Sequence, residues 1–166
     1  FVAEVEAKRD PRLMIFGPPR HGKTEHSQIQ MPSWAMRNHP DWLFMGIGHS
    51  NTLVVDHTSA RMRDVVMSER FRELGGRPLR ADRQGLTEWR FDEGGGIIPA
   101  GLNSGKPMGR GAKVLNVDDF YKNEQQAYSP AARSKVLSQI RMLHDRIVPG
   151  GGVIYNIHRW HDEDAA

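Results

Sequence analysis

Short apolar runs alternate along the chain with longer segments in which apolar and polar residues are mixed. The apolar runs predict strands, and the mixed segments predict helices because their apolar positions recur at helical spacing. Strands that alternate with helices favour an α/β fold, with a mostly parallel sheet and right-handed crossovers. The expected strands are residues 12–16, buried, then 43–48, 88–92, 96–100, 113–117 and 153–157; the expected helices are 23–37, 51–67 and 130–144.

Helix boundaries are indicated by capping and breaking residues. Residues 1–8 are typical of the end of a helix, and Pro32 is expected to interrupt the helix over 23–37. Ser50 or Asn51 suits the N-cap of the helix over 51–67. Residues 68–74 could extend that helix, and the two glycines at 75 and 76 are expected to end it.

Glycines mark two connections. Gly94, Gly95 and Gly96 predict a tight turn, so the strands on either side are expected to form a hairpin. Residues 101–111 predict a glycine-rich loop that leads into the strand over 113–117.

Composition limits the class of protein. The chain has 166 residues, 38% hydrophobic and 26% charged, which suits one soluble domain over 1–166. It has no cysteine, so disulfides and thiolate metal sites are excluded; this fits a cytosolic protein. No apolar run approaches the length of a membrane span. The chain starts at Phe1 in a charged stretch without a signal-peptide pattern, and we interpret it as part of a longer protein.

Residues 17–24, GPPRHGKT, fit the phosphate-binding P-loop pattern G-x-x-x-x-G-K-[ST] at every fixed position, between a predicted strand and a predicted helix. Two of the variable residues are prolines and have no N–H to donate, so the backbone donors are expected from residue 20 onward. Lys23 is expected to reach the β- and γ-phosphates of a nucleotide, and Thr24 to bind Mg²⁺ through its hydroxyl. The predicted nucleotide-binding residues are Gly17, Pro18, Pro19, Arg20, His21, Gly22, Lys23 and Thr24.

A pair of acids ends the apolar run KVLNVDD. A buried parallel strand places its C-terminal residues at the ligand crevice of the sheet. Asp118 is therefore the expected carboxylate for Mg²⁺, directly or through water. Asp119 is the expected catalytic base, which orients and deprotonates an attacking water.

Three segments together resemble the large terminase subunit of tailed bacteriophages. They are PPRHGKT, VDDFYKNEQQAYSP and YNIHRWHDED, in this order along nearly the whole chain. The resemblance implies a P-loop NTPase fold of the ASCE class, which has an added strand and an acid-activated water, and an ATP-driven motor that threads DNA into a procapsid. The family's nuclease domain is expected to lie beyond Ala166, so no DNA cleavage is expected from this segment.

The same resemblance implies further roles for individual residues. Arg20 is a possible sensor of the nucleotide state, and residues 157–161 match a segment that couples hydrolysis to movement. Many family members have a glutamate where Asp119 stands, and often a threonine where His158 stands. Arg110, between Gly109 and Gly111, is the expected catalytic arginine supplied to a neighbouring subunit, with Arg20 as the competing candidate within the same subunit.

The resemblance also implies partners and place. The expected cofactors are ATP and Mg²⁺, and the expected partners are double-stranded DNA, further copies of this chain in a ring, a portal protein and a small terminase subunit, without a membrane. The expected location is the host cytoplasm, at the procapsid portal. The formal charge of +3 permits a polyanionic partner without requiring one.

Seven arginines lie between residues 61 and 83, among four acids. We interpret these arginines as part of a solvent-exposed helix face. The alternative is that they contact DNA or a neighbouring subunit. The arginines are Arg61, Arg63, Arg70, Arg72, Arg77, Arg80 and Arg83.

Two other functions remain open. A small-molecule P-loop kinase would need an acceptor pocket and an arginine-bearing lid, and the Asp118–Asp119 pair argues against it. A non-hydrolysing nucleotide-binding module is the third possibility, and Asp119 at the expected position of the water argues against that.

Overall fold

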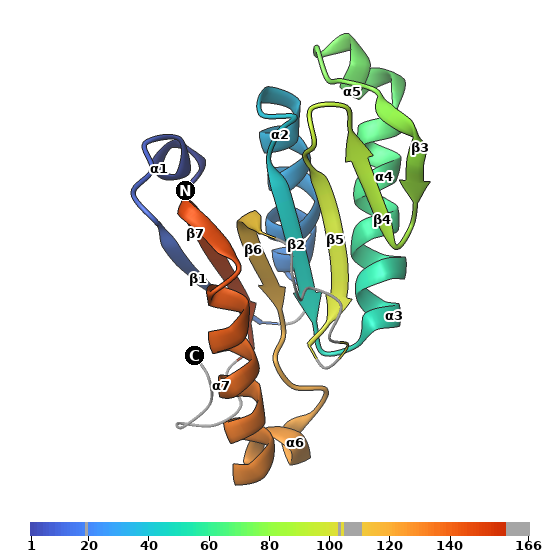
Figure 1. Cartoon of the computed structure of the whole chain (residues 1–166). Helices are drawn as coiled ribbons and strands as arrows, with labels where there is room; N and C mark the ends of the chain where they lie inside the picture. Colours follow the sequence, from blue (N-terminus) through green and yellow to red (C-terminus); the bar gives the residue numbers. More distant parts are fainter. Residues whose placement is uncertain (19, 103, 105–110, 159–166) are drawn as a thin grey trace.

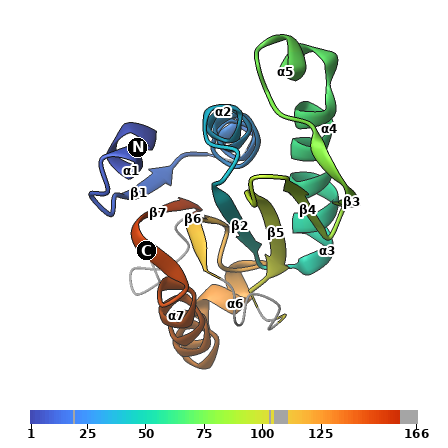
Figure 2. The ribbon, with the colours of Figure 1, turned by 45° about the horizontal axis from the view of Figure 1, so that its top comes forward.

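The computed structural model describes residues 1–18, 20–102, 104 and 111–158. These residues form an α/β fold in which helices cover both faces of a seven-stranded sheet (Figures 1 and 2). The strands are β1 (Arg12–Phe16), β2 (Leu43–Gly48), β3 (Leu79–Gly85), β4 (Glu88–Phe91), β5 (Gly96–Gly101), β6 (Ala112–Asp118) and β7 (Ile147–Ile157). The helices are α1 (Val2–Glu6), η1 (Glu25–Gln30), α2 (Met31–Asn38), α3 (Asn51–Leu53), η2 (Val54–Ser59), α4 (Ala60–Met67), α5 (Glu69–Glu73), α6 (Glu124–Tyr128) and α7 (Pro130–His144).

The sheet is mostly parallel, as predicted. Its strand order is β1-β7-β6-β2-β5-β4-β3, and the first five strands in this order run parallel. In the register, Gly48 pairs with Asp118 and Asp118 pairs with Asn156, while Phe16 pairs with Ile157. The carboxyl ends of β1, β7, β6 and β2 therefore share one edge of the sheet, the lower edge in Figure 1.

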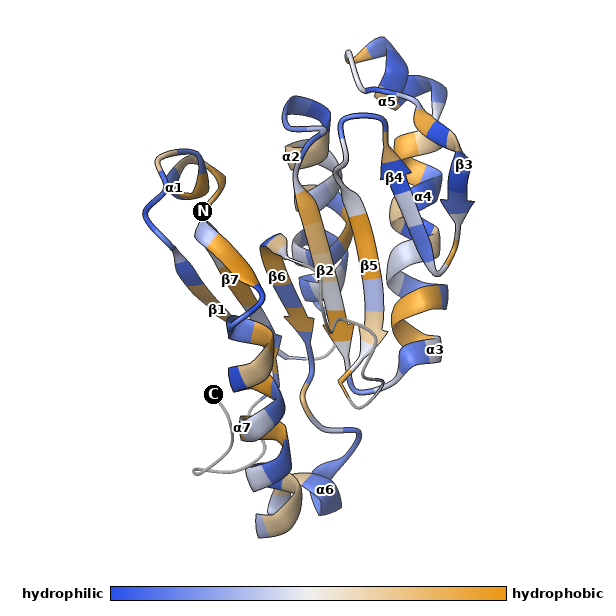
Figure 3. Cartoon of the chain, in the orientation of Figure 1, coloured by the Kyte–Doolittle hydropathy of each residue, from blue (hydrophilic) through white to orange (hydrophobic). Residues whose placement is uncertain are grey.

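Alternating residues of the central strands fill two hydrophobic cores, one on each face. Leu115 and Val117 of β6 pack on the face that α6 and α7 cover, whereas Val114 packs with α1, α2 and α4 on the other. Figure 3 shows hydrophobic residues gathered on the central strands and hydrophilic ones on β3 and α5. Because both faces are covered, the central strands are apolar almost throughout, which is why they could be recognised in the sequence.

The helix after β1 is not interrupted at Pro32, contrary to the prediction. The chain stays helical from residue 23 to Asn38, through the π-helical η1 and then α2. Met31 donates its backbone N–H to the carbonyl of His26, five residues back, and Pro32 lies in the first turn of α2. The wider turn comes directly before the proline, which lacks an N–H, and the helix continues past it.

The helix over 51–67 forms as α3, η2 and α4, but residues 68–74 do not extend it. Ser50 is the residue before the helix, and its side chain makes no capping hydrogen bond. Ser68 breaks the helix with a ψ of 151°, and its hydroxyl accepts a hydrogen bond from the N–H of Phe71. Serine competes with the helical backbone in this way, so α5 is a separate helix.

The two ends of the sheet differ from the predictions. Strand β1 is paired only with β7 in the described structure, so it is an edge strand, and the prediction that it is buried was wrong. Leu13, Met14 and Phe16 are 37%, 43% and 54% exposed. At the other end, β3 was not predicted; it pairs antiparallel with β4, which forms the predicted hairpin with β5.

Candidate nucleotide site

The loop over 17–24 leads from the end of β1 into the following helix. Arg20 and Gly22 have positive φ angles of 62° and 78°, so the backbone turns sharply twice before the helix begins at residue 23. Glycine adopts this left-handed conformation without steric cost, which explains the glycine at position 22. Pro19 lies outside the described residues.

Lys23 folds back over the loop. Its ammonium group donates hydrogen bonds to the carbonyl oxygens of Gly17, at 2.5 Å, and Pro18, at 3.1 Å. The positive charge thus lies within the curve of the loop, where the P-loop pattern expects phosphate. A phosphate that binds there would replace these carbonyls as the partner of the ammonium.

Thr24 and Asp118 meet across 94 positions of sequence. The Thr24 hydroxyl donates to Oδ2 of Asp118 at 3.0 Å. Thr24 lies at the start of the helix after β1, and Asp118 at the carboxyl end of β6, two strands away. The two side chains that the sequence assigned to Mg²⁺ are therefore neighbours, and both offer the oxygen ligands that Mg²⁺ prefers.

Burial, followed by the charge of Asp119, raises the pKa of Asp118 to about 6. Hydrogen bonds from Thr24 and Asn156 and the charge of Lys23 act in the opposite direction. Asp118 is thus an acid that a bound cation would stabilise in its charged form.

Asp119 is held by the backbone of β7 and the residue after it. Its N–H donates to the carbonyl of Asn156 at 2.9 Å, and its Oδ1 accepts from the N–H of His158 at 3.0 Å. Its φ of 49° is in the left-handed region, which aspartate tolerates better than most residues. This turn directs the carboxylate of Asp119 differently from that of Asp118.

A cavity of about 350 Å³ joins these residues. The loop residues and both acids line it together with Glu25, which was not predicted. Glu25 forms an ion pair with Arg61 of α4 and accepts a hydrogen bond from Gln30 at 2.7 Å. The hydrogen bond from Gln30 is the main cause that lowers the pKa of Glu25. The residues that line the cavity are Arg20, Gly22, Lys23, Thr24, Glu25, Asp118 and Asp119.

Asn156 is the second residue that sequence reasoning missed. Its Nδ2 donates to Oδ1 of Asp118 at 2.6 Å, and it lies 3.5 Å from Oγ1 of Thr24. The signal was an amide in the otherwise apolar run VIYNI at the carboxyl end of a predicted strand. Glu25 had no comparable signal, because an acid in the first turn of a helix is common.

Some predicted residues lie outside the described part of the chain. Arg110 is among them, and so are residues 159–161 of the predicted coupling segment. Among the described residues, no group of three or more His, Cys, Asp or Glu side chains could hold a metal ion. A magnesium ion bound with a nucleotide takes only one or two protein ligands besides the phosphates, and Thr24 and Asp118 are two side chains that could supply them.

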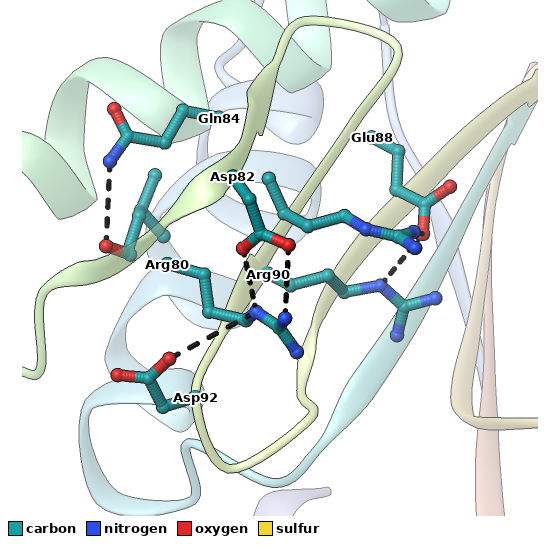
Figure 4. Close-up of polar contacts among 8 residues, drawn as sticks. Arg80, Asp82, Gln84, Glu88, Arg90 and Asp92 are labelled. Carbon is teal, nitrogen blue, oxygen red and sulfur yellow. Dashed lines mark hydrogen bonds and ion pairs between the residues drawn. The ribbon is translucent and has the colours of Figure 1, made fainter.

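The arginines between 61 and 83 do not share one helix face. Arg80 and Arg83 lie on β3, where their neighbours are acids (Figure 4). Arg80 pairs with Asp82 at 2.9 Å, and Arg83 pairs with Glu88 at 3.2 Å. The prediction of a helix face was wrong for these two, because β3 has too few apolar residues to be recognised as a strand. It was also wrong for Arg77, which lies between α5 and β3 outside any helix.

Comparisons with models of known protein families and with curated proteins find no match for this chain. The resemblance to large terminases therefore depends on the quoted motifs. A search of the helices in the described residues finds none with the length and apolar character needed to cross a membrane.

Proposed function

We propose that this chain is the ATP-hydrolysing motor domain of a DNA-packaging machine of the large-terminase type. The observation that carries the proposal is the hydrogen bond between Thr24 and Asp118. It joins a complete P-loop pattern to an acidic strand end, and the sequence predicts the same Mg²⁺-nucleotide site for both. The position of β7 between β1 and β6 also supports the class of P-loop protein that has an added strand.

In this proposal, a few residues have separate roles in ATP hydrolysis. Lys23 binds the β- and γ-phosphates of ATP, and Thr24 and Asp118 hold Mg²⁺. A bound Mg²⁺ supplies positive charge at the phosphate oxygens.

Asp119 orients a water molecule, whose oxygen bonds to the γ-phosphorus while the bond from that phosphorus to the bridging oxygen of ADP breaks. The proton of the water passes to Asp119, whose Oδ1 is held by the N–H of His158. The products are ADP and inorganic phosphate.

The site borders the segment assigned to movement. Residues 157 and 158 follow Asn156 directly, and His158 contacts Asp119 through its N–H. A change at Asp119 during hydrolysis would therefore reach this segment through one hydrogen bond. The terminase resemblance gives the expected result of that movement, which is translocation of double-stranded DNA.

The test is the ATPase rate with and without double-stranded DNA. We expect turnover that DNA stimulates and that is lost in the Lys23→Ala variant. ATP turnover in that variant at the parent rate would contradict the proposal. Turnover that DNA leaves unchanged would contradict the motor part of it.

Transfer of phosphate to a small molecule is a second candidate, favoured by another cavity. This cavity, of about 460 Å³, opens beyond the carboxyl end of β2 and includes His49, Asp56, His57 and Lys122 among its lining residues. It lies at the same edge of the sheet as Asp118, where a kinase would hold its acceptor. Radiolabelled ATP distinguishes the two functions, because a kinase yields a labelled organic product and an ATPase yields labelled phosphate.

A further inference from the structure

Asn156 is a buried polar residue near the end of β7, beside Asp118 in the sheet register. Its side-chain Nδ2 contacts both predicted ligands of the cation: it donates to Oδ1 of Asp118 at 2.6 Å and lies 3.5 Å from the hydroxyl oxygen of Thr24. Its backbone carbonyl accepts the N–H of Asp119 at 2.9 Å. One residue thus contacts Thr24, Asp118 and Asp119.

These contacts fix the orientation of the Asp118 carboxylate. Oδ1 accepts from Asn156 and Oδ2 accepts from Thr24, so each oxygen has one donor on a different element. Rotation of the carboxylate would break both bonds. The Thr24 hydroxyl and the Asp118 carboxylate are therefore held side by side before any cation binds.

Asn116 on the neighbouring strand is a buried asparagine with a structural role, and it can be compared with Asn156. Its Oδ1 accepts from Gln28 at 2.5 Å, and its Nδ2 donates to the carbonyl of Ser27 at 2.7 Å. Both ends of this amide are satisfied, and they join β6 to η1. Neither of these two partners is an acid of the site.

Asn156 differs in that its Oδ1 has no hydrogen-bond partner in the described structure. An unpaired buried oxygen destabilises a fold, so good packing alone does not account for this amide. The hydrogen bonds that its side chain makes are directed at the groups assigned to the cation.

We propose that Asn156 is a positioning residue for the divalent cation: it holds Asp118 and Thr24 in the arrangement that binds Mg²⁺, without binding the ion itself. This inference rests on the proposed function, because it needs a Mg²⁺-nucleotide complex at the site. Residues that orient metal ligands in this way typically contribute about 10- to 100-fold to metal affinity. The contribution of Asn156 is therefore to the Mg²⁺-dependent part of nucleotide binding.

The test measures the affinity of fluorescently labelled ADP in Mg²⁺ and in EDTA. For the parent chain we expect tighter binding in Mg²⁺, and the ratio of the two affinities is the gain due to the cation. Asn156→Ala is expected to lower this gain by about tenfold while leaving the affinity in EDTA unchanged. The matched control is Asn116→Ala, which removes an equally buried amide from the next strand and should retain the gain.

Three outcomes overturn the inference. If Asn156→Ala keeps the full gain, Asn156 does not position the cation ligands. If both asparagine variants lose the gain equally, the loss follows from general destabilisation. If the parent chain binds no labelled ADP in either condition, the proposed function fails and the inference fails with it. Should Asn156→Ala not fold, Asn156→Ser replaces it, since a serine side chain is too short to reach Asp118 and should show the same loss.

Discussion

Asp118 and Asp119 are neighbours in sequence, but the structure holds them in different ways. Side chains of two other elements fix the carboxylate of Asp118, whereas backbone groups at the end of β7 hold Asp119. The first arrangement suits a cation ligand, and the second suits the base that we propose, since backbone groups fix one of its carboxylate oxygens. The two acids should therefore fail in different ways when they are changed.

Asp118→Asn is expected to weaken Mg²⁺-dependent nucleotide binding by at least about tenfold, because an amide is a poorer ligand for a hard cation. Asp119→Asn should keep binding and lose most turnover, because an amide can position water but cannot accept its proton. Nucleotide titrations and steady-state turnover on both variants check this. The reverse pattern would exchange the two roles.

The raised pKa of Asp118 gives a pH dependence with a defined sign. The folded chain binds this proton more tightly than the unfolded chain, so the contribution of Asp118 to stability is fully present below about pH 4 and is lost as the pH rises through about 6. The loss is roughly 3 kcal/mol at most. We expect urea denaturation to show the free energy of unfolding of the ligand-free parent falling relative to Asp118→Asn over this range. A constant difference between the two would contradict the assignment.

Lys23→Ala should lower ATP turnover at least about 100-fold while circular dichroism shows an unchanged fold, because in the proposed function the ammonium is the positive charge that binds the phosphates in the loop. Lys135→Ala is the control, since Lys135 is an exposed lysine on α7, and it should turn over ATP as the parent does. If the two variants hydrolyse ATP at equal rates, Lys23 has no role in ATP turnover.

The residues that sequence reasoning identified share one property: they belong to a pattern with a fixed spacing or a fixed place. Lys23 and Thr24 are fixed by the P-loop pattern, and Asp118 by its place at the end of an apolar strand. Asn156 has no such pattern, and its role depends on β7 lying next to β6, which strand order alone determines. Local sequence could therefore not predict that contact.

Among the elements, the central strands and α7 were predictable because they bury apolar residues on a regular period. Helix α7 has the predicted bounds. The edges were not predictable: β3 is a strand because β4 offers it backbone partners, and β1 is exposed because its only described neighbour is β7. Such effects depend on the position of a strand in the sheet, and the hydropathy of the sequence does not indicate that position.

The β4–β5 turn offers a matched pair of glycines. Gly94 and Gly96 both have a positive φ, of 97° and 136°, but a Cβ at Gly94 would meet open space and one at Gly96 would lie 2.2 Å from the carbonyl oxygen of Trp89. Gly94→Ala should cost about 1–2 kcal/mol of stability from backbone strain alone. Gly96→Ala should cost at least about 2 kcal/mol more, because buried backbone must move. Urea denaturation measures both, and equal losses would mean that the turn relaxes freely.

At the scale of the whole molecule, the sheet gathers the candidate site from segments spread along the chain. The loop after β1, the end of β6 and the end of β7 meet at one edge. The proposed motor adds one more component, an arginine from a neighbouring copy, and Arg110 remains the predicted donor. The alternative is Arg20, which lines the cavity of its own chain.

A mixing experiment separates these arginines. Arg110→Ala subunits keep an intact phosphate loop, and Lys23→Ala subunits keep the arginine. If Arg110 acts on a neighbour, mixed rings should recover ATPase activity that neither variant shows alone; an arginine finger contributes about 10³-fold or more to the rate. Mixed rings that contain both variants and stay inactive would favour Arg20 instead.

The pairing of β1 with β7 has a consequence for how the chain folds. It joins Arg12 to Val153, so the contact closes a loop that includes most of the chain. Contacts of such long sequence separation form slowly, since the entropy of closing the loop is lost before they stabilise anything. The phosphate loop and the acidic strand can be synthesised and partly ordered well before β7 inserts between their strands. The candidate site is thus expected to be among the last parts to assemble, and a nucleotide bound there as proposed should slow unfolding without accelerating folding.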